Sequence, residues 1–221
     1  MPVLPSEGLS PEGFLPEIHT SLRDGTPILL RPVRPEDKPR FIAGLKMMSM
    51  ENRYLRFFAP VAALTPQQLE FLTEVDQVSH VAWGALDPAA PDFPGFSVAR
   101  YVCLPGEAGV AEVAVAVIDT MHRRGLGTVL LGLLYLLAGR GGVRTLRGTL
   151  MPANQFLIRW ARDFGAAIKY VDGAYQADVP VITDPAELPD TPEGRKFKKV
   201  FLEMKAALFP QEGMDGVQEG T

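Results

Sequence analysis

The sequence predicts an α+β fold, in which helices and a mixed β-sheet form layers around one hydrophobic core. Three observations support this fold class: strand-like runs recur along the chain, helical patterns lie between them, and one apolar strand leads through a glycine-bearing turn into a strongly apolar helix. With 221 residues, 47% of them hydrophobic, the chain can bury a substantial core. We expect one folded domain over residues 18–209, a flexible arm over residues 1–17 and a disordered tail over residues 210–221.

The N-terminal half is predicted to begin with a hairpin and to contain two helices. The Asp24-Gly25 pair favours a tight turn, so two short strands are expected between residues 18 and 33. One helix is expected over residues 34–49, and a second begins after Thr65, which precedes a proline at the first helical position. Three consecutive strands should follow, over residues 79–86, 95–103 and 110–118.

The C-terminal half continues the alternation of helices and strands. The apolar stretch that ends at Gly139 is well short of the roughly 20 residues that span a bilayer, so it is interpreted as a buried helix rather than a membrane segment. Phe197, Phe201 and Leu208 recur on one face of a final amphipathic helix. The remaining expected elements are a strand over residues 145–151, a helix over 153–164 and a hairpin over 167–181.

Composition restricts the classes of partner. A net charge of -4 and a pI near 5.5 give no global attraction for nucleic acid, so we expect none as a partner. The N-terminus lacks the basic and apolar regions of a signal peptide, and the chain has one cysteine, so we expect a cytoplasmic protein without a disulfide, a metal site or a membrane partner.

A turn between an apolar strand and an apolar helix is the most informative motif. Gly125 and Gly127 lack Cβ atoms, so a ligand can approach the backbone amides at the positive end of the helix dipole. Arg123 and Arg124 add charges that can pair with phosphate oxygens. The spacing does not fit a dinucleotide fingerprint, because position 130 is leucine, and there is no Walker loop. The turn therefore predicts a phosphate site.

The pattern His122-Arg123-Arg124-Gly125-Leu126-Gly127 resembles motif A of the GNAT acetyltransferases, in which the first position is usually Gln or Arg. The resemblance implies a mixed, mostly antiparallel sheet of six to seven strands, flanked by helices and splayed between the fourth and fifth strands. It also implies acetyl-CoA as the acyl donor, with CoA as the product. The cofactor-binding positions implied are Val117, Ile118 and Asp119 for the pantetheine arm, His122, Arg123, Arg124, Gly125, Leu126, Gly127 and Thr128 for the pyrophosphate, and Asn154 as a further CoA contact.

Asn154 begins a predicted helix that resembles motif B of the same family, and a helix N-cap is an equally good role for it. Many relatives carry at position 161 a tyrosine that protonates the departing thiolate. Here that residue is Ala161, so this acid is missing and the group that protonates CoA stays open.

Glu112 is the candidate catalytic residue. It is the only charged residue of the strand GVAEVAVAVI, and must either face a polar cleft or be driven toward its neutral form by burial. The Ala-Glu pair also resembles the strand of protein lysine acetyltransferases that supplies a general base, which implies this role for Glu112. The alternative is that Glu112 lies at the start of the strand and simply meets solvent.

Residues 49–58, 64–66 and 73–76, followed by His80, resemble the acetyltransferase domain of bacterial Pat-type protein lysine acetyltransferases, and the likeness covers about residues 19–180. It implies direct attack by a protein lysine. A small-molecule amine acceptor and a non-catalytic acyl-CoA sensor stay as alternatives. Arg53, Arg56 and His80 could line the acceptor cleft, but the two arginines are interpreted as packing residues paired with surface carboxylates. Regulation by a cyclic-nucleotide-binding domain is not expected, while acceptor identity, acyl-chain preference and oligomeric state, including a homodimer, stay open.

Overall fold

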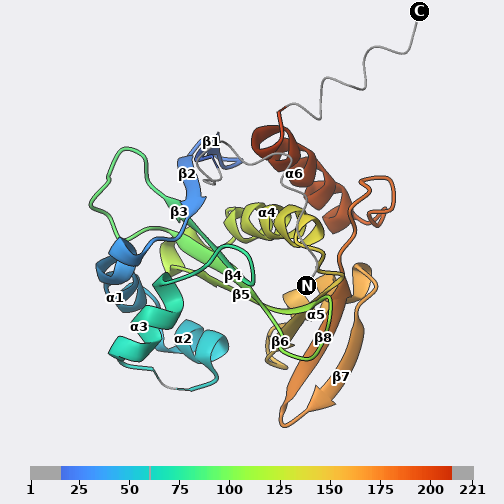
Figure 1. The fold of residues 1–221 in the computed structure, drawn as a ribbon, viewed down its shortest axis with the longest axis horizontal. Helices are drawn as coiled ribbons and strands as arrows, with labels where there is room; N and C mark the ends of the chain where they lie inside the picture. The colour runs from blue at the N-terminus through green and yellow to red at the C-terminus, as the bar shows by residue number, and fades with distance from the viewer. Residues whose placement is uncertain (1–15, 60, 211–221) are drawn as a thin grey trace, which may run out of the picture.

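The computed structural model describes residues 16–59 and 61–210, so nearly all of the expected arm and tail lie outside it. One eight-stranded sheet crosses the molecule in the order β1-β2-β3-β4-β5-β6-β8-β7 (Figure 1). All neighbouring strands are antiparallel except β5 and β6, which are parallel. The strands are β1 (Ile18–Ser21), β2 (Pro27–Pro32), β3 (His80–Leu86), β4 (Ser97–Cys103), β5 (Val110–Val117), β6 (Thr145–Leu150), β7 (Ala167–Val171) and β8 (Ala174–Pro180).

Six α-helices accompany the sheet within the described ranges: α1 (Lys38–Lys46), α2 (Met50–Phe57), α3 (Pro66–Thr73), α4 (Leu126–Arg140), α5 (Gln155–Asp163) and α6 (Pro192–Leu208). Helix α2 was not predicted. Its apolar residues Met50, Tyr54 and Phe57 recur at helical spacing, but none of its residues is buried. A further signal was Ser49, whose side chain accepts a hydrogen bond from the Asn52 amide as an N-cap.

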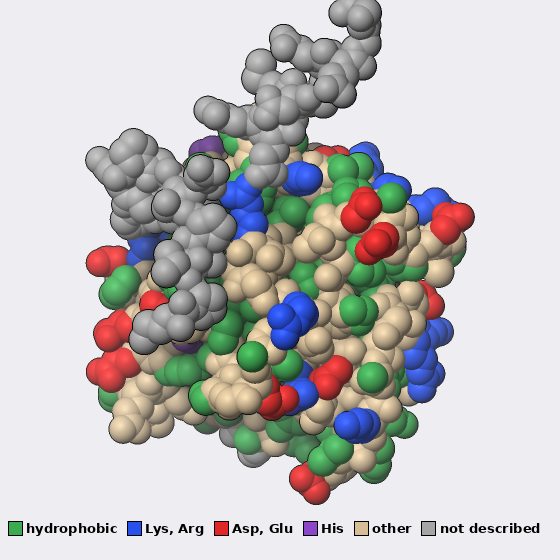
Figure 2. All heavy atoms as spheres, turned by 45° about the vertical axis from the view of Figure 1, so that its right-hand side comes forward, with side chains coloured by type: hydrophobic (Ala, Val, Ile, Leu, Met, Phe, Trp, Pro, Cys, Tyr) green, Lys and Arg blue, Asp and Glu red, His purple; other side chains and the backbone are tan. Residues whose placement is uncertain are grey.

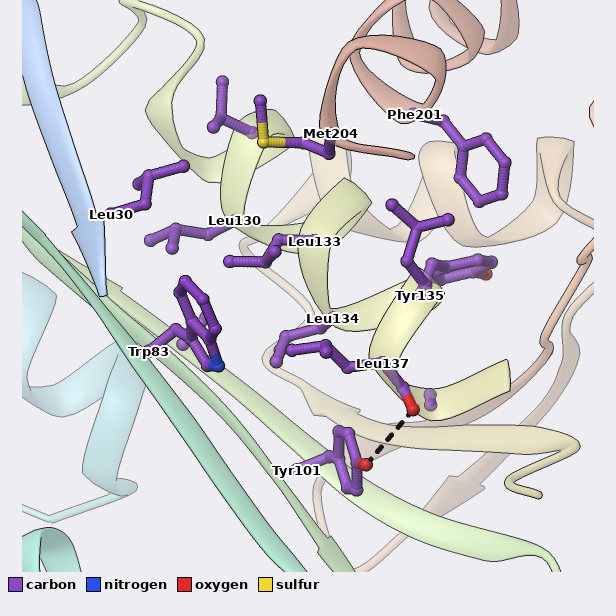
Figure 3. Close-up of a cluster of buried hydrophobic side chains, with 14 of the residues drawn as sticks. Leu30, Trp83, Tyr101, Leu130, Leu133, Leu134, Tyr135, Leu137, Phe201 and Met204 are labelled. Atoms are coloured by element: carbon purple, nitrogen blue, oxygen red, sulfur yellow. Dashed lines mark hydrogen bonds between the residues drawn. The ribbon is translucent and has the colours of Figure 1, made fainter. Parts of the chain in front are cut away.

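The helices cover both faces of the sheet. The Tyr101 hydroxyl on β4 lies 3.5 Å from the Leu137 carbonyl oxygen of α4, as the dashed line in Figure 3 shows. The neighbouring Arg100 points to the opposite face, where it donates to the Leu72 carbonyl of α3. Because successive strand residues alternate between faces, α4 and α6 form one outer layer, and α1, α2 and α3 form the other.

Helix α4 lies at the centre of the core. Leu133 and Leu134 are completely buried between the sheet and α6, and Figure 3 shows Phe201 and Met204 of α6 on the side of α4 that faces away from the sheet. Gly132 permits close contact of the two helices, because a Cβ there would lie 3.1 Å from the Val200 side chain. A helix buried on nearly all sides explains the unbroken apolar stretch in the sequence.

Strand β5 separates from β6 soon after it begins. It pairs with β4 from Ala111 to Val117, but with β6 only from Val110 to Glu112. The layered α+β class and the expected splay are therefore confirmed, with two corrections. The sheet has eight strands rather than six or seven, because both the N-terminal and the C-terminal hairpin contribute two. The splay consequently lies between the fifth and sixth strands rather than between the fourth and fifth.

Lys, Arg, Asp and Glu side chains are interspersed on the face drawn in Figure 2. Charges of both signs distributed in this way produce no extended field of one sign there. Within residues 16–59 and 61–210, every helix is too short or too polar to cross a membrane.

Replacing a core leucine of α4 tests the importance of this packing. Leu133→Ala should lower the free energy of unfolding by about 2–5 kcal/mol, because it leaves a cavity at a completely buried position. Leu202→Ala is the control, since Leu202 of α6 is 45% exposed and should change stability by less than about 1 kcal/mol. Urea unfolding measures both, and equal losses would show that α4 is not the centre of the core.

Candidate active site

The turn before α4 offers a row of unpaired backbone amides. Arg123 and Gly125 both have positive φ angles, of 61° and 91°. The first amide of this region with a backbone partner is that of Thr128, which donates to the Gly125 carbonyl. The N–H groups of residues 123–127 donate to no described residue. These amides, at the positive end of a buried helix, form a site suited to an anion.

The surface of this turn is open to a ligand. A Cβ atom built on Gly125 or Gly127 would meet no atom within 4 Å, so the two glycines border free space rather than a packed neighbour. Gly125 also needs its flexibility, because its φ angle of 91° is unfavourable for other residues. Gly127 has an ordinary helical conformation, so its absent side chain serves only to leave room.

The two arginines of the turn differ in their contacts. Arg124 donates to the Asp24 carboxylate at 2.6 Å and to the Thr26 hydroxyl, and thereby ties the turn to the β1–β2 hairpin. The hydrogen bond from Arg124 is the main reason that the pKa of Asp24 lies well below its usual value. Arg123 is exposed and contacts no charged group among the described residues. Of the pair predicted to face phosphate, Arg123 is therefore the one whose charge is uncommitted.

His122 closes the turn against the end of β5. Its Nε2 atom lies 3.0 Å from the carbonyl oxygen of Val117, which accepts a hydrogen bond from the ring. At the position where the GNAT pattern has Gln or Arg, this chain thus has a side chain that binds its own backbone. This hydrogen bond joins the turn to the end of β5, and the His122 side chain is exposed.

The free edge of β5 can be identified from its register. The Ile118 amide donates to Phe96 on the β4 side, so the alternate residues Val113, Val115 and Val117 direct their backbone groups toward β6. Pairing with β6 has ended by that point. Sequence reasoning named Val117 but missed Val113 and Val115, which the two-residue period of a strand identifies once one hydrogen bond is known. Ile118 is excluded from this edge, because its amide is already bonded.

Asp119 anchors α2 to the same region. Its carboxylate accepts hydrogen bonds from the Ser49 amide at 3.1 Å and from the Asn52 side chain at 2.7 Å. Burial opposes the effect, but the bonds from Asn52 and Ser49 dominate and lower the pKa of Asp119. A residue predicted to bind the pantetheine arm through its backbone therefore has a side chain that holds the α2 layer against the end of β5.

Glu112 lies on the sheet face covered by α1, α2 and α3. It pairs with Val102 across β4, and its side chain is exposed rather than buried. Exposure fits both a polar cleft and a side chain that simply meets solvent. Arg56 of α2 is close enough to feel the Glu112 charge, but the two side chains do not form an ion pair within 4 Å.

The remaining predicted positions lie on α5. The Asn154 side chain accepts a hydrogen bond from the Leu157 amide at 3.3 Å, so the N-cap role is present. Ala161 is 2% exposed and packs in the core, where no acid is available at that position. The described residues contain no group of three or more His, Cys, Asp or Glu side chains that could hold a metal ion.

An eight-stranded mixed sheet with one splayed parallel pair, and an anion turn beside that splay, together define a GNAT-type acyltransferase site. Comparison with known proteins agrees. Acetyltransferase Pat of Mycolicibacterium smegmatis is 34% identical over 172 residues, which are 72% of this chain and 50% of that protein. Acetyltransferase PA5475 of Pseudomonas aeruginosa is 30% identical over 151 residues, 68% of this chain and 78% of that protein.

Among solved structures, the GNAT domain of S. lividans PAT matches 74% of this chain and 96% of its own, with 28% identity and a TM-score of 0.66. No protein-family model matches the chain. The chain belongs to the GNAT acetyltransferase family, whose members use acetyl-CoA as the donor. It spans about half the length of the mycobacterial Pat protein.

Removing the Asp119 anchor should loosen α2. In Asp119→Ala, amide hydrogen exchange across residues 50–57 should accelerate about 5-fold or more, because hydrogen bonds to a charged group are lost. Since the pKa of Asp119 is lowered, the anchor is complete above the usual aspartate pKa of about 4 and is lost as the pH falls below it. Asp163→Ala, at an exposed carboxylate of α5, is the control. Unchanged exchange in α2 would disprove the anchor.

Proposed function

We propose that this protein transfers the acetyl group of acetyl-CoA to the ε-amine of a protein lysine, by direct attack and with Glu112 as the general base. The observation that carries the proposal is the position of Glu112. Its exposed carboxylate lies at the last point where β5 pairs with β6, immediately before the free strand edge that leads to the anion turn. Base, donor arm and phosphate site then lie in order along one segment, from residue 112 to residue 128.

The residues of this segment fit the donor. The free amides of residues 123–127 and the uncommitted Arg123 suit a pyrophosphate, while Gly127 leaves the space it would occupy. The backbone groups of Val113 and Val115 and the Val117 amide suit the amide groups of a pantetheine arm laid along β5, in place of a neighbouring strand. Thr128 lies in the first turn of α4, and Asn154 is the N-cap of α5. Both side chains could add polar contacts to the donor.

Glu112 would accept the proton of the lysine ammonium, directly or through one water molecule, so that the neutral amine attacks the thioester carbonyl. Backbone N–H groups on the free edge of β5 are available to donate to the developing oxyanion. Ala161 cannot protonate the departing sulfur. A thiol has a usual pKa of about 8.5, so CoA can leave as the thiolate and take a proton from water.

An exposed apolar surface supports a protein acceptor. Helix α2 packs against β5, and its outer face displays aromatic and methionine side chains of the kind enriched in protein interfaces. The exposed residues of this surface on α2 and α3 are Met50, Tyr54, Phe58 and Phe71. A lysine brought by another protein would enter beside this surface, on the face that carries Glu112.

Gly127→Glu tests the phosphate site. The change should weaken acetyl-CoA binding at least about 100-fold, because the new carboxylate competes for the free amides and repels the pyrophosphate. It should leave Tm nearly unchanged, since Gly127 is helical and has no neighbour within 4 Å. Ala206→Glu on the exposed side of α6 adds the same charge as a control. Calorimetric titration measures binding, and full affinity in Gly127→Glu would refute the site.

Glu112→Gln tests the base. We expect kcat/KM to fall about 100-fold or more, because general base catalysis contributes this much, while the Kd for acetyl-CoA changes little. Glu70→Gln, on the exposed side of α3, is the matched control. A variant with near wild-type turnover would remove Glu112 from the mechanism.

Acceptor class is settled by supplying labelled acetyl-CoA with either cell-lysate proteins or a panel of small amines. Label in proteins supports the lysine acceptor. Rapid turnover of small amines without protein labelling would replace it with a small-molecule acceptor, and donor binding without turnover on any acceptor would favour an acyl-CoA sensor.

A further inference from the structure

A cavity of about 100 Å³ lies between the sheet and the layer formed by α1, α2 and α3. Its walls include the Phe41 and Phe57 rings and, at the end of β5, Ala116 and Val117. It therefore reaches the strand segment along which the donor arm is proposed to lie. Apolar walls with a few polar groups are typical of small ligand sites.

The charges that line the cavity are unbalanced. They comprise four arginines and one aspartate: Arg31, Arg40, Arg56, Arg100 and Asp37. Asp37 binds Arg31 through two hydrogen bonds, at 2.6 and 2.8 Å, and its carboxylate lies 3.3 Å from Arg40. Asp37, the single acid, is thus paired with Arg31 and Arg40. Arg56 and Arg100 are left without it.

Arg100 is 3% exposed and has only neutral partners among the described residues. It donates to the Leu72 carbonyl oxygen at 3.0 Å and to Nε2 of His80 at 2.9 Å. Burial, together with the charge of Arg100, lowers the pKa of His80 to about 4, so the imidazole is neutral at physiological pH. Burial and the charge of Arg56 also lower the pKa of Arg100 to about 9, so its guanidinium still carries the proton at physiological pH.

Arg56 is the second cation without an ion pair among the described residues, although the charge of Glu112 acts on it from more than 4 Å away. It was expected to pair with a surface carboxylate, but within the described residues it forms no ion pair or hydrogen bond, and its guanidinium lies 5.1 Å from the centre of the Phe57 ring. Arg53, by contrast, donates to the carbonyl oxygens of Met48 and Val61 and acts as a packing residue. Arg100 is buried and Arg56 is partly buried, and the charge of Arg56 lowers the pKa of Arg100. Two neighbouring cations of this kind are costly unless an anion joins them.

We propose that this cavity binds a carboxylate carried by the acceptor, held between Arg56 and Arg100. Guanidinium groups recognise carboxylates through paired hydrogen bonds, and Arg100 is already desolvated. Arg100 pairs across the sheet with Ala114, two residues from Glu112 on the same face, a distance of about 6.6 Å along the strand. A carboxylate in the cavity would therefore lie close to the amine that Glu112 deprotonates. The proposal rests on the acetyl-transfer function given above.

The test compares acceptors that differ by one charge. N-acetylated Glu-Lys amide is compared with N-acetylated Gln-Lys amide, and free lysine is compared with lysinamide. The first pair reports a side-chain carboxylate beside the lysine, and the second reports the α-carboxylate of a small amine. Wild type should prefer the charged member of one pair at least about 10-fold in kcat/KM, which corresponds to about 1.4 kcal/mol.

Arg56→Gln should reduce that preference to about 1, and Arg56→Lys should restore part of it. Arg162→Gln, at an exposed arginine of α5, should keep the full preference. Equal use of both members of each pair by wild type would overturn the proposal, as would a preference that survives Arg56→Gln.

A binding measurement separates this proposal from the proposed function. N-acetylglutamate titrated into the whole protein should bind in wild type and in Arg162→Gln, and should bind at least about 10-fold more weakly in Arg56→Gln. This result supports the carboxylate site even if no acceptor is acetylated. Equal binding by Arg56→Gln and wild type would refute the site even if lysines are acetylated.

Discussion

The packing of α4 between the sheet and α6 is the constraint on which the site depends. An apolar helix buried on two sides cannot rotate or slide without losing contacts at Leu133, Leu134 and Phe201. Its first turn is therefore held at one position relative to the end of β5. The amides of residues 123–127, which donate to no described residue, are therefore held near the end of β5. The hydrophobic core thus supplies the rigidity of a polar site.

Polar contacts complete what the core begins. Two sets of hydrogen bonds connect the region of the anion turn to distant parts of the chain. Arg124 binds Asp24 of the β1–β2 hairpin, and Asp119 binds Ser49 and Asn52. The charge of Arg124, which was predicted to face phosphate, is thereby paired with Asp24. On the proposed function, anion binding would then depend on the backbone amides and on Arg123.

The parts predictable from the sequence were those determined by neighbouring residues. The glycines at 125 and 127, the apolar helix after them and the isolated Glu112 form one local pattern, and its placement beside the splay was correct. Contacts across the chain were not predictable in this way. Arg124 and Asp24 are 100 positions apart, and the balance of charge around Arg56 depends on four separate elements. Helix α2 was missed although its apolar residues recur at helical spacing behind the Ser49 N-cap.

The weak attachment of α2 divides the molecule into two halves of different character. The donor half is built on the core and is fixed before any ligand arrives. The other half is bordered by α2, a helix with no buried residue, which is held by its caps, by the hydrogen bonds to Asp119 and by the carbonyl bonds of Arg53. Such a wall adjusts its shape at little enthalpic cost but loses conformational entropy when an incoming chain orders it. An acceptor that binds by induced fit would then be selected more by the positions of its charges than by the complementarity of its shape.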